Sequence, residues 1–112
     1  KYIRPAMGIT VDSKLNKRLA EHLKISGVII LSISPGSAAE EAGLEGATVT
    51  PEGNIVANDV IVAIDGKSID SVDKLFSRID NYKVGDTIKL TVRRYGDRSE
   101  EVEVPITLQS GE

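Results

Sequence analysis

The sequence predicts an α+β domain in which five to six antiparallel strands form a small, partly open barrel packed by two to three helices. Short apolar runs, either β-branched or alternating with polar residues, recur between turn signals, and shorter segments have the spacing of helices. At 112 residues, 40% hydrophobic and 28% charged, the chain has the size and composition of one globular domain. It contains one Phe and no Trp, so we expect an aliphatic core of Val, Ile, Leu and Ala.

The first part of the chain predicts a strand followed by a helix. Met7–Val11 is short, apolar and β-prone. Asp12 or Ser13 can cap a helix that runs to about Lys24 and is stopped by Gly27. The apolar stripe of this helix recurs at i, i+4 and i+8 and consists of Leu15, Leu19 and Leu23.

The middle of the chain predicts a buried strand, a short helix and a surface insertion. Val28–Ile33 is a nearly continuous β-branched run, which is typical of a buried central strand. Ser37–Glu40 has the form of a capping box, in which each of the two side chains accepts from an otherwise unpaired amide, and Gly43 ends the helix. Residues 46–58 are polar and rich in turn residues, so we expect a surface insertion with a small hairpin around Glu52-Gly53.

A second strand and a second long helix follow this insertion. Val60–Ile64 predicts another buried strand, Asp65-Gly66 a tight turn and Lys67–Ile69 a short return strand. Ser71 can cap a helix that runs to about Tyr82. The apolar positions of this helix have the spacing i, i+3, i+4 and i+7 and are Val72, Leu75, Phe76 and Ile79.

The end of the chain predicts a β-hairpin. Ile88–Val92 and Val102–Leu108 both alternate apolar with polar residues, and Gly96-Asp97 is a turn signal between them. We therefore expect one domain over residues 1–109 and a disordered tail over residues 110–112. Because the chain does not begin with Met, we expect it to be part of a longer protein, and a processed natural N-terminus is the alternative.

Composition argues against several classes of function. Cysteines are absent, so no thiolate site can form, and the only histidine, His22, is expected to be a surface residue rather than the base of a Ser-His-Asp triad. We expect no catalytic residue, metal or cofactor. His22 lies off the leucine stripe of its helix, and Ser37 already serves as a helix cap. A net charge of −3 does not favour nucleic acid as a partner, and no apolar run approaches the roughly 18 residues needed to insert into a membrane. The classes of function that remain are a binding domain and a structural domain.

Three stretches resemble the PDZ domain that follows the catalytic domain in HtrA/Deg-type serine proteases. Tyr2–Ile9 is similar to the start of that domain, Gly27–Leu44 has its strand, S-P-x-S-x-A, helix and A-G-L pattern, and Asn58–Ile69 is similar to its G-D and N-G segment. Asn58 stands where glycine is usual and Asp65 where asparagine is common. Because the similar carboxylate-binding loop opens the chain, the resemblance implies the circularly permuted order of bacterial-type PDZ domains.

The resemblance implies a binding site for the C-terminus of a peptide. A peptide would add as a strand to the edge Met7–Val11, which includes Thr10, and the amides of Met7, Gly8 and Ile9 would bind its terminal carboxylate. On the helix, the resemblance places Val72, Phe76 and Ile79 toward the peptide and Leu75 toward the core. Arg4 would add long-range attraction, and a solvated surface charge is the alternative for this residue.

The same resemblance implies partners and a setting. We expect the C-termini of unfolded or mislocalised proteins as ligands, an attached serine protease, and a role in protein quality control in a bacterial periplasm or cell envelope. The isolated domain should be a monomer and the parent a homo-oligomer. A PDZ domain of an intramembrane metalloprotease, a C-terminal processing protease or a secretion component is one alternative, and a docking domain that binds no peptide is another.

Overall fold

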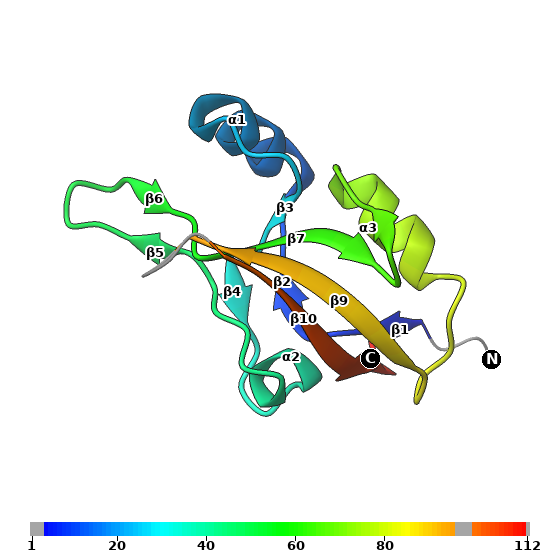
Figure 1. Cartoon of the computed structure of the whole chain (residues 1–112). Helices are drawn as coiled ribbons and strands as arrows, with labels where there is room; N and C mark the ends of the chain where they lie inside the picture. Colours follow the sequence, from blue (N-terminus) through cyan, green and yellow to red (C-terminus); the bar gives the residue numbers. More distant parts are fainter. Residues whose placement is uncertain (1–3, 96–99, 112) are drawn as a thin grey trace.

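The computed structural model describes residues 4–95 and 100–111, which form an α+β domain of short antiparallel strands and three helices (Figure 1). This confirms the predicted fold class, although the strands are shorter and more numerous than expected. The elements in chain order are β1 (Pro5–Ala6), β2 (Ile9–Thr10), α1 (Ser13–Leu23), β3 (Val28–Ile29), β4 (Ser32–Ile33), α2 (Ala38–Glu41), β5 (Thr48–Val49), β6 (Ile55–Val56), β7 (Asp59–Ile64), β8 (Lys67–Ser68), α3 (Val72–Ile79), β9 (Thr87–Arg94), β10 (Glu100–Thr107) and β11 (Gln109–Ser110).

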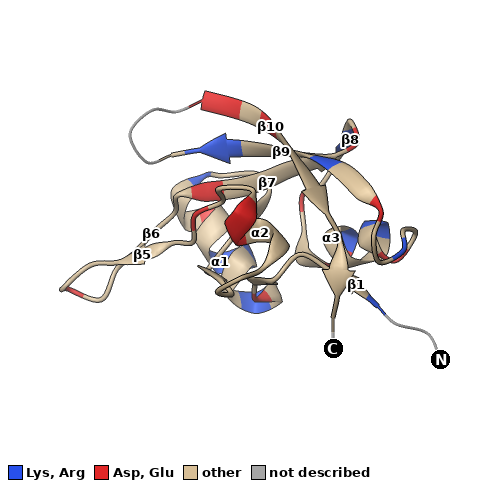
Figure 2. Ribbon diagram, turned by 90° about the horizontal axis from the view of Figure 1, so that it is seen from below, with Lys and Arg blue, Asp and Glu red and all other residues tan. Residues whose placement is uncertain are grey.

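The main sheet contains five antiparallel strands in the order β10-β9-β7-β3, with β8 paired to β7. Among the described residues, three further strand pairs, β1 with β11, β2 with β4 and β5 with β6, surround it. The predicted terminal hairpin is present as β9 and β10, and its expected turn at Gly96-Asp97 lies outside the described residues. Opposite charges face each other near that end, where Glu100 pairs with Arg94 and Glu101 with Arg93 (Figure 2).

The core is aliphatic, as predicted. Its main cluster combines strands of the central sheet with Leu75 of α3, which is completely buried. Phe76, the only phenylalanine, is outside this core and 40% exposed. The helix α3 begins after its predicted cap, since the Ser71 hydroxyl accepts from the Lys74 N–H, but it ends at Ile79 rather than near Tyr82.

Helix α1 is capped by Asp12 as predicted, but its leucine stripe is not its most buried part. Leu15 and Leu19 are half-buried and Leu23 is 37% exposed, while Asn16 is the buried residue of the helix. The Asn16 side chain donates to the Gly27 carbonyl at 3.1 Å and accepts from the Ile29 N–H at 2.7 Å. These hydrogen bonds to the start of β3 therefore anchor the helix. Leu19 also packs against a small second core cluster of Ile29, Ala57 and Val60.

The run Val28–Ile33 is not one central strand, which corrects the prediction. Its first two residues form β3, which ends the main sheet beside β7, and its last two form β4, which pairs with β2. The change of partner falls between Ile30 and Leu31. The Ile30 N–H donates to the main-chain carbonyl of Asp59, whereas the Leu31 N–H donates to that of Thr10. Buried residues before this corner, Val28–Ile30, and half-buried Leu31 and Ile33 after it produced the nearly continuous apolar run.

The predicted surface insertion is a hairpin of β5 and β6, with its turn around Glu52-Gly53 (Figure 1). Val49 is 66% exposed and Val56 45% exposed, which confirms that the hairpin lies at the surface. The predicted disordered tail is wrong for Ser110 and Gly111. Ser110 belongs to β11, which pairs with β1, and the Gly111 N–H donates to the Arg4 carbonyl at 2.8 Å. The remaining tail position, residue 112, lies outside the described residues.

Candidate peptide-binding site

Strand β2 has a neighbour on one side only among the described residues. It pairs with β4, with Ile9 opposite Ile33 and Thr10 opposite Ser32. The carbonyls of Gly8 and Thr10 accept from residues at the two ends of β4. Main-chain groups alternate between the two sides of a strand, so those of Ile9 point away from β4. An edge of this kind can accept one more strand.

Gly8 brings the chain against the start of α2 just before β2. Its φ is +85°, and a Cβ built there would lie 2.2 Å from the Ser37 Cβ and 2.7 Å from the Ser37 Oγ. The preceding carbonyl, that of Met7, accepts from the Ala39 N–H at 2.9 Å. Glycine is therefore required here by a close contact with α2 as well as by its positive φ.

The residues predicted at the strand side of the site differ in exposure. The Met7 side chain is 2% exposed and belongs to the core, so a ligand would meet its main chain rather than its side chain. Ile9 and Val11 are half-buried and pack against that core, whereas Thr10 is exposed. Tyr2 and Ile3, which carried part of the resemblance, lie outside the described residues.

On the helix side, Phe76 is the only one of the three predicted residues with substantial exposure. Val72 is 6% exposed and Ile79 is 2% exposed, and both belong to the same core cluster as Leu75. Val72 and Ile79 therefore support this face from beneath, and their contact with a ligand remains a prediction. Ile9 and Val11 pack against the same cluster, which connects β2 to α3 through shared core residues.

Arg4 makes contacts that the sequence did not indicate. Its guanidinium donates from Nε to Oδ1 of Asp80 at 3.0 Å and from a terminal nitrogen to Oδ2 at 3.1 Å. It also lies over the Phe76 ring, 5.3 Å from the ring centroid. Asp80 was missed because 76 residues separate it from Arg4, and no local pattern marks such a contact.

The titratable groups with shifted pKa values support the fold rather than this site. Burial raises the pKa of Asp59, although its hydrogen bond from the Glu45 N–H and the charge of Arg94 oppose that effect. A hydrogen bond from the Tyr82 hydroxyl lowers the pKa of Asp65, which also accepts from the Lys89 N–H. Both carboxylates thus connect segments that are distant in the chain.

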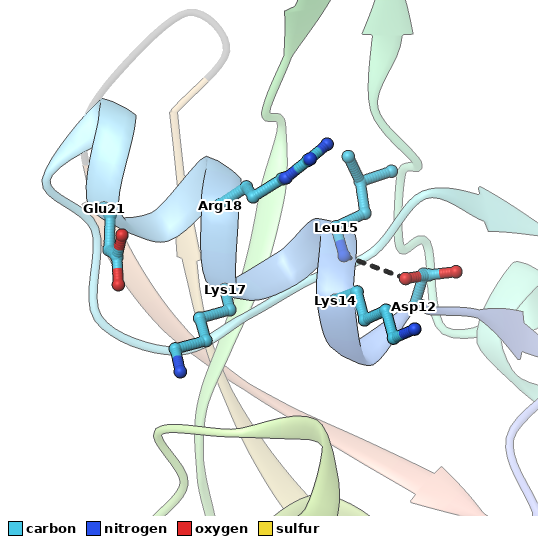
Figure 3. Close-up of a pocket in the computed structure, with 6 residues that line it drawn as sticks. All are labelled: Asp12, Lys14, Leu15, Lys17, Arg18 and Glu21. Carbon is cyan, nitrogen blue, oxygen red and sulfur yellow. Dashed lines mark hydrogen bonds between the residues drawn. The ribbon is translucent and has the colours of Figure 1, made fainter.

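The remaining surface can be compared with the requirements of a metal site and of a membrane-spanning helix. Within residues 4–95 and 100–111, no group of three His, Cys, Asp or Glu residues is placed to hold a metal ion. No helix in these ranges is long and apolar enough to cross a membrane. A hollow on α1 is bordered by side chains that point in different directions rather than at one spot (Figure 3).

A small α+β domain with a one-sided strand and a helix that shares its core is an arrangement found in domains that accept an added peptide strand. The family model described as "PDZ domain" matches residues 5–106, and the chain belongs to the PDZ domain family. Its relatives include Protease Do-like 1, chloroplastic, from Arabidopsis thaliana, which is 31% identical over 106 residues, covering 95% of this chain and 23% of the relative. Serine protease Do-like HtrA from Lactobacillus helveticus is 28% identical over 97% of this chain and 25% of its own length.

Solved structures show the same fold. The HtrA-type protease AlgW with decapeptide aligns with a TM-score of 0.71 and 22% identity, over 98% of this chain and 30% of that protein chain. The HtrA3 PDZ domain bound to a phage-derived ligand, FGRWV, aligns with a TM-score of 0.63 and 18% identity, over 97% of this chain and 88% of that one. The named relatives confirm the predicted resemblance to HtrA/Deg-type proteases. This chain spans about a quarter of the length of the curated relatives described above.

Proposed function

We propose that this PDZ domain captures hydrophobic C-termini of other proteins by adding them as a strand to β2. The pairing of β2 with β4 alone is the observation that carries the proposal. A peptide antiparallel to β2 would use the outward main-chain groups of Ile9 and extend toward Val11. Its last side chain would pack on Phe76, with Val72 and Ile79 beneath.

The terminal carboxylate would bind main-chain amides at Met7, Gly8 and Ile9. Each hydrogen bond to a charged group contributes about 1.5–3 kcal/mol, so two or three of them can anchor a short peptide. The positive φ of Gly8 turns the main chain at this point, and such a turn can direct successive amides toward one anion. In support, the structurally similar HtrA3 PDZ domain is bound to the phage-derived ligand FGRWV.

We further propose that the parent is a serine protease of the HtrA/Deg type, a homo-oligomer of a bacterial periplasm or cell envelope that acts in protein quality control. Bound C-termini of unfolded or mislocalised proteins would tether substrate or shift the attached protease toward activity. A ligand can shift that balance only by its difference in affinity for the two states. The sequence of the parent before Lys1 tests the assignment to a serine protease. A Gly-Asn-Ser-Gly-Gly segment is expected there, and its absence would contradict the assignment.

Matched peptides test the binding step. Fluorescence polarisation should give micromolar affinity for free-acid peptides that end in Val, Leu, Ile or Phe and have an apolar third-from-last residue. Amidation of the C-terminus should weaken binding about tenfold or more, because the charged acceptor is lost. Equal affinities for acid and amide would reject carboxylate recognition. Absence of binding by either form would favour a docking domain that binds no peptide.

A further inference from the structure

We propose that Asp80 is a specificity-determining residue, which holds Arg4 across Phe76 and so weakens the capture of chain ends until a ligand carboxylate takes its place. The inference rests on the proposed function and adds a residue that the site described above does not require. It concerns only the described contacts among Arg4, Phe76 and Asp80.

Among the described contacts, the Arg4 guanidinium meets both Asp80 and Phe76. Both Asp80 carboxylate oxygens accept from Arg4, at 3.0 and 3.1 Å, in the paired arrangement that favours arginine with carboxylates. The same guanidinium lies 5.3 Å from the centroid of the Phe76 ring. Asp80 therefore fixes Arg4 over the one exposed aromatic residue to which the proposed function assigns the ligand's last side chain.

A peptide terminus offers Arg4 a chemically equivalent partner. Like Asp80, it is a carboxylate with two oxygens, and it arrives together with the side chain that must pack on Phe76. Arg4 lies four residues before Gly8, so its charge is close in the chain to the amides proposed to bind that terminus. Exchange of Asp80 for the ligand carboxylate would uncover the ring and keep the guanidinium paired.

The position of Asp80 supports a role other than helix stability. Asp80 is the C-cap of α3, where the negative end of the helix dipole disfavours an acidic side chain. The Arg4 and Asp80 side chains are 56% and 42% exposed, so a ligand can reach both. Because exposed ion pairs are weak, loss of this restraint should change affinity only about twofold to fivefold.

The test measures binding of one free-acid peptide and its amide to the wild-type domain, Asp80→Asn and Asp70→Asn. Asp70→Asn is the matched control, since it removes the same charge from an exposed i,i+4 pair with Lys74. Asp80→Asn should bind the free acid about twofold to fivefold more tightly and should bind the amide with a smaller gain, because the amide benefits only from the uncovered Phe76 ring. Asp70→Asn should match the wild type for both peptides. Thermal unfolding verifies that each variant is folded.

The Arg4→Gln background separates the restraint from simple repulsion by Asp80. If Asp80 acts through Arg4, then Asp80→Asn has no further effect in an Arg4→Gln domain. The proposal would be overturned if Asp80→Asn still increased affinity for the free acid in the Arg4→Gln domain. It would also be overturned if Asp80→Asn alone left that affinity unchanged or lowered it. If the wild type does not prefer acid over amide, the proposed function fails first, which is a distinguishable result.

Discussion

At the scale of single residues, Asn16 shows how one polar side chain can position a helix. It is 5% exposed and bridges the buried Gly27 carbonyl and Ile29 N–H. A main-chain group left buried without a partner costs about 1–3 kcal/mol. The amide side chain thus replaces hydrogen bonds that a neighbouring strand would otherwise supply at this edge of the sheet.

Substitution of Asn16 by Ala should therefore lower the free energy of unfolding by about 2 kcal/mol or more, because both buried main-chain groups lose their partner. Urea unfolding followed by circular dichroism measures this change. Lys17→Ala is the control, since Lys17 is the exposed next residue of the same helix and its loss should change stability by less than about 0.5 kcal/mol. Equal effects of the two substitutions would contradict the anchoring role of Asn16.

At the scale of elements, the two long helices are held in different ways. Leu75 of α3 is completely buried, whereas Leu23 at the end of α1 is 37% exposed. Leu75→Ala should cost about 2–5 kcal/mol through lost burial and a cavity. Leu23→Ala should cost less than about 1 kcal/mol, because Leu23 is partly exposed, leaves no enclosed cavity and is replaced by a residue that favours a helix. Thermal unfolding of both variants tests this contrast, and a Leu23 effect as large as that of Leu75 would show that α1 is packed as its stripe suggested.

The sequence predicted those elements whose signals are local. The caps Asp12, Ser37 and Ser71 were identifiable because a cap accepts from an amide about three residues ahead. The Asp65-Gly66 turn was identifiable because Asp-Gly is a favoured pair in turns whose two central residues have positive φ. Both residues have positive φ in the structure. Periodicity also found the leucine stripe of α1, but it could not show that the helix lies at the rim of the sheet, where few residues are available to cover it.

Features that depend on distant partners were beyond local patterns. The corner within Val28–Ile33 arises because the chain leaves β7 and pairs next with β2, and no local pattern in the run marks this change of partner. In the candidate site, Gly8 and Phe76 were identified by resemblance, whereas Asp80 was not. An ion pair across 76 residues follows from the fold and leaves no spacing signal in the chain.

At the scale of the whole molecule, β2 is paired on one side only among the described residues, and its Ile9 packs on the core cluster that contains the buried residues of α3. The terminal strands help to fix its start, since β11 pairs with β1 and the Gly111 N–H donates to the Arg4 carbonyl. Contacts of Met7 and Gly8 with α2 fix the loop that follows. Both chain ends of the domain thus stabilise the segment to which the proposed function assigns the ligand carboxylate.

Amide hydrogen exchange of the ¹⁵N-labelled domain, followed by NMR without and with a saturating free-acid peptide that ends in Val, tests this free side most directly. The Ile9 amide should exchange quickly in the free domain, since it points away from β4, and slow at least about tenfold when a peptide strand covers it. The Leu31 amide, which already donates to Thr10, serves as the internal control and should change little. An Ile9 amide that is protected before peptide is added, and unaltered afterwards, would mean that no strand can join here.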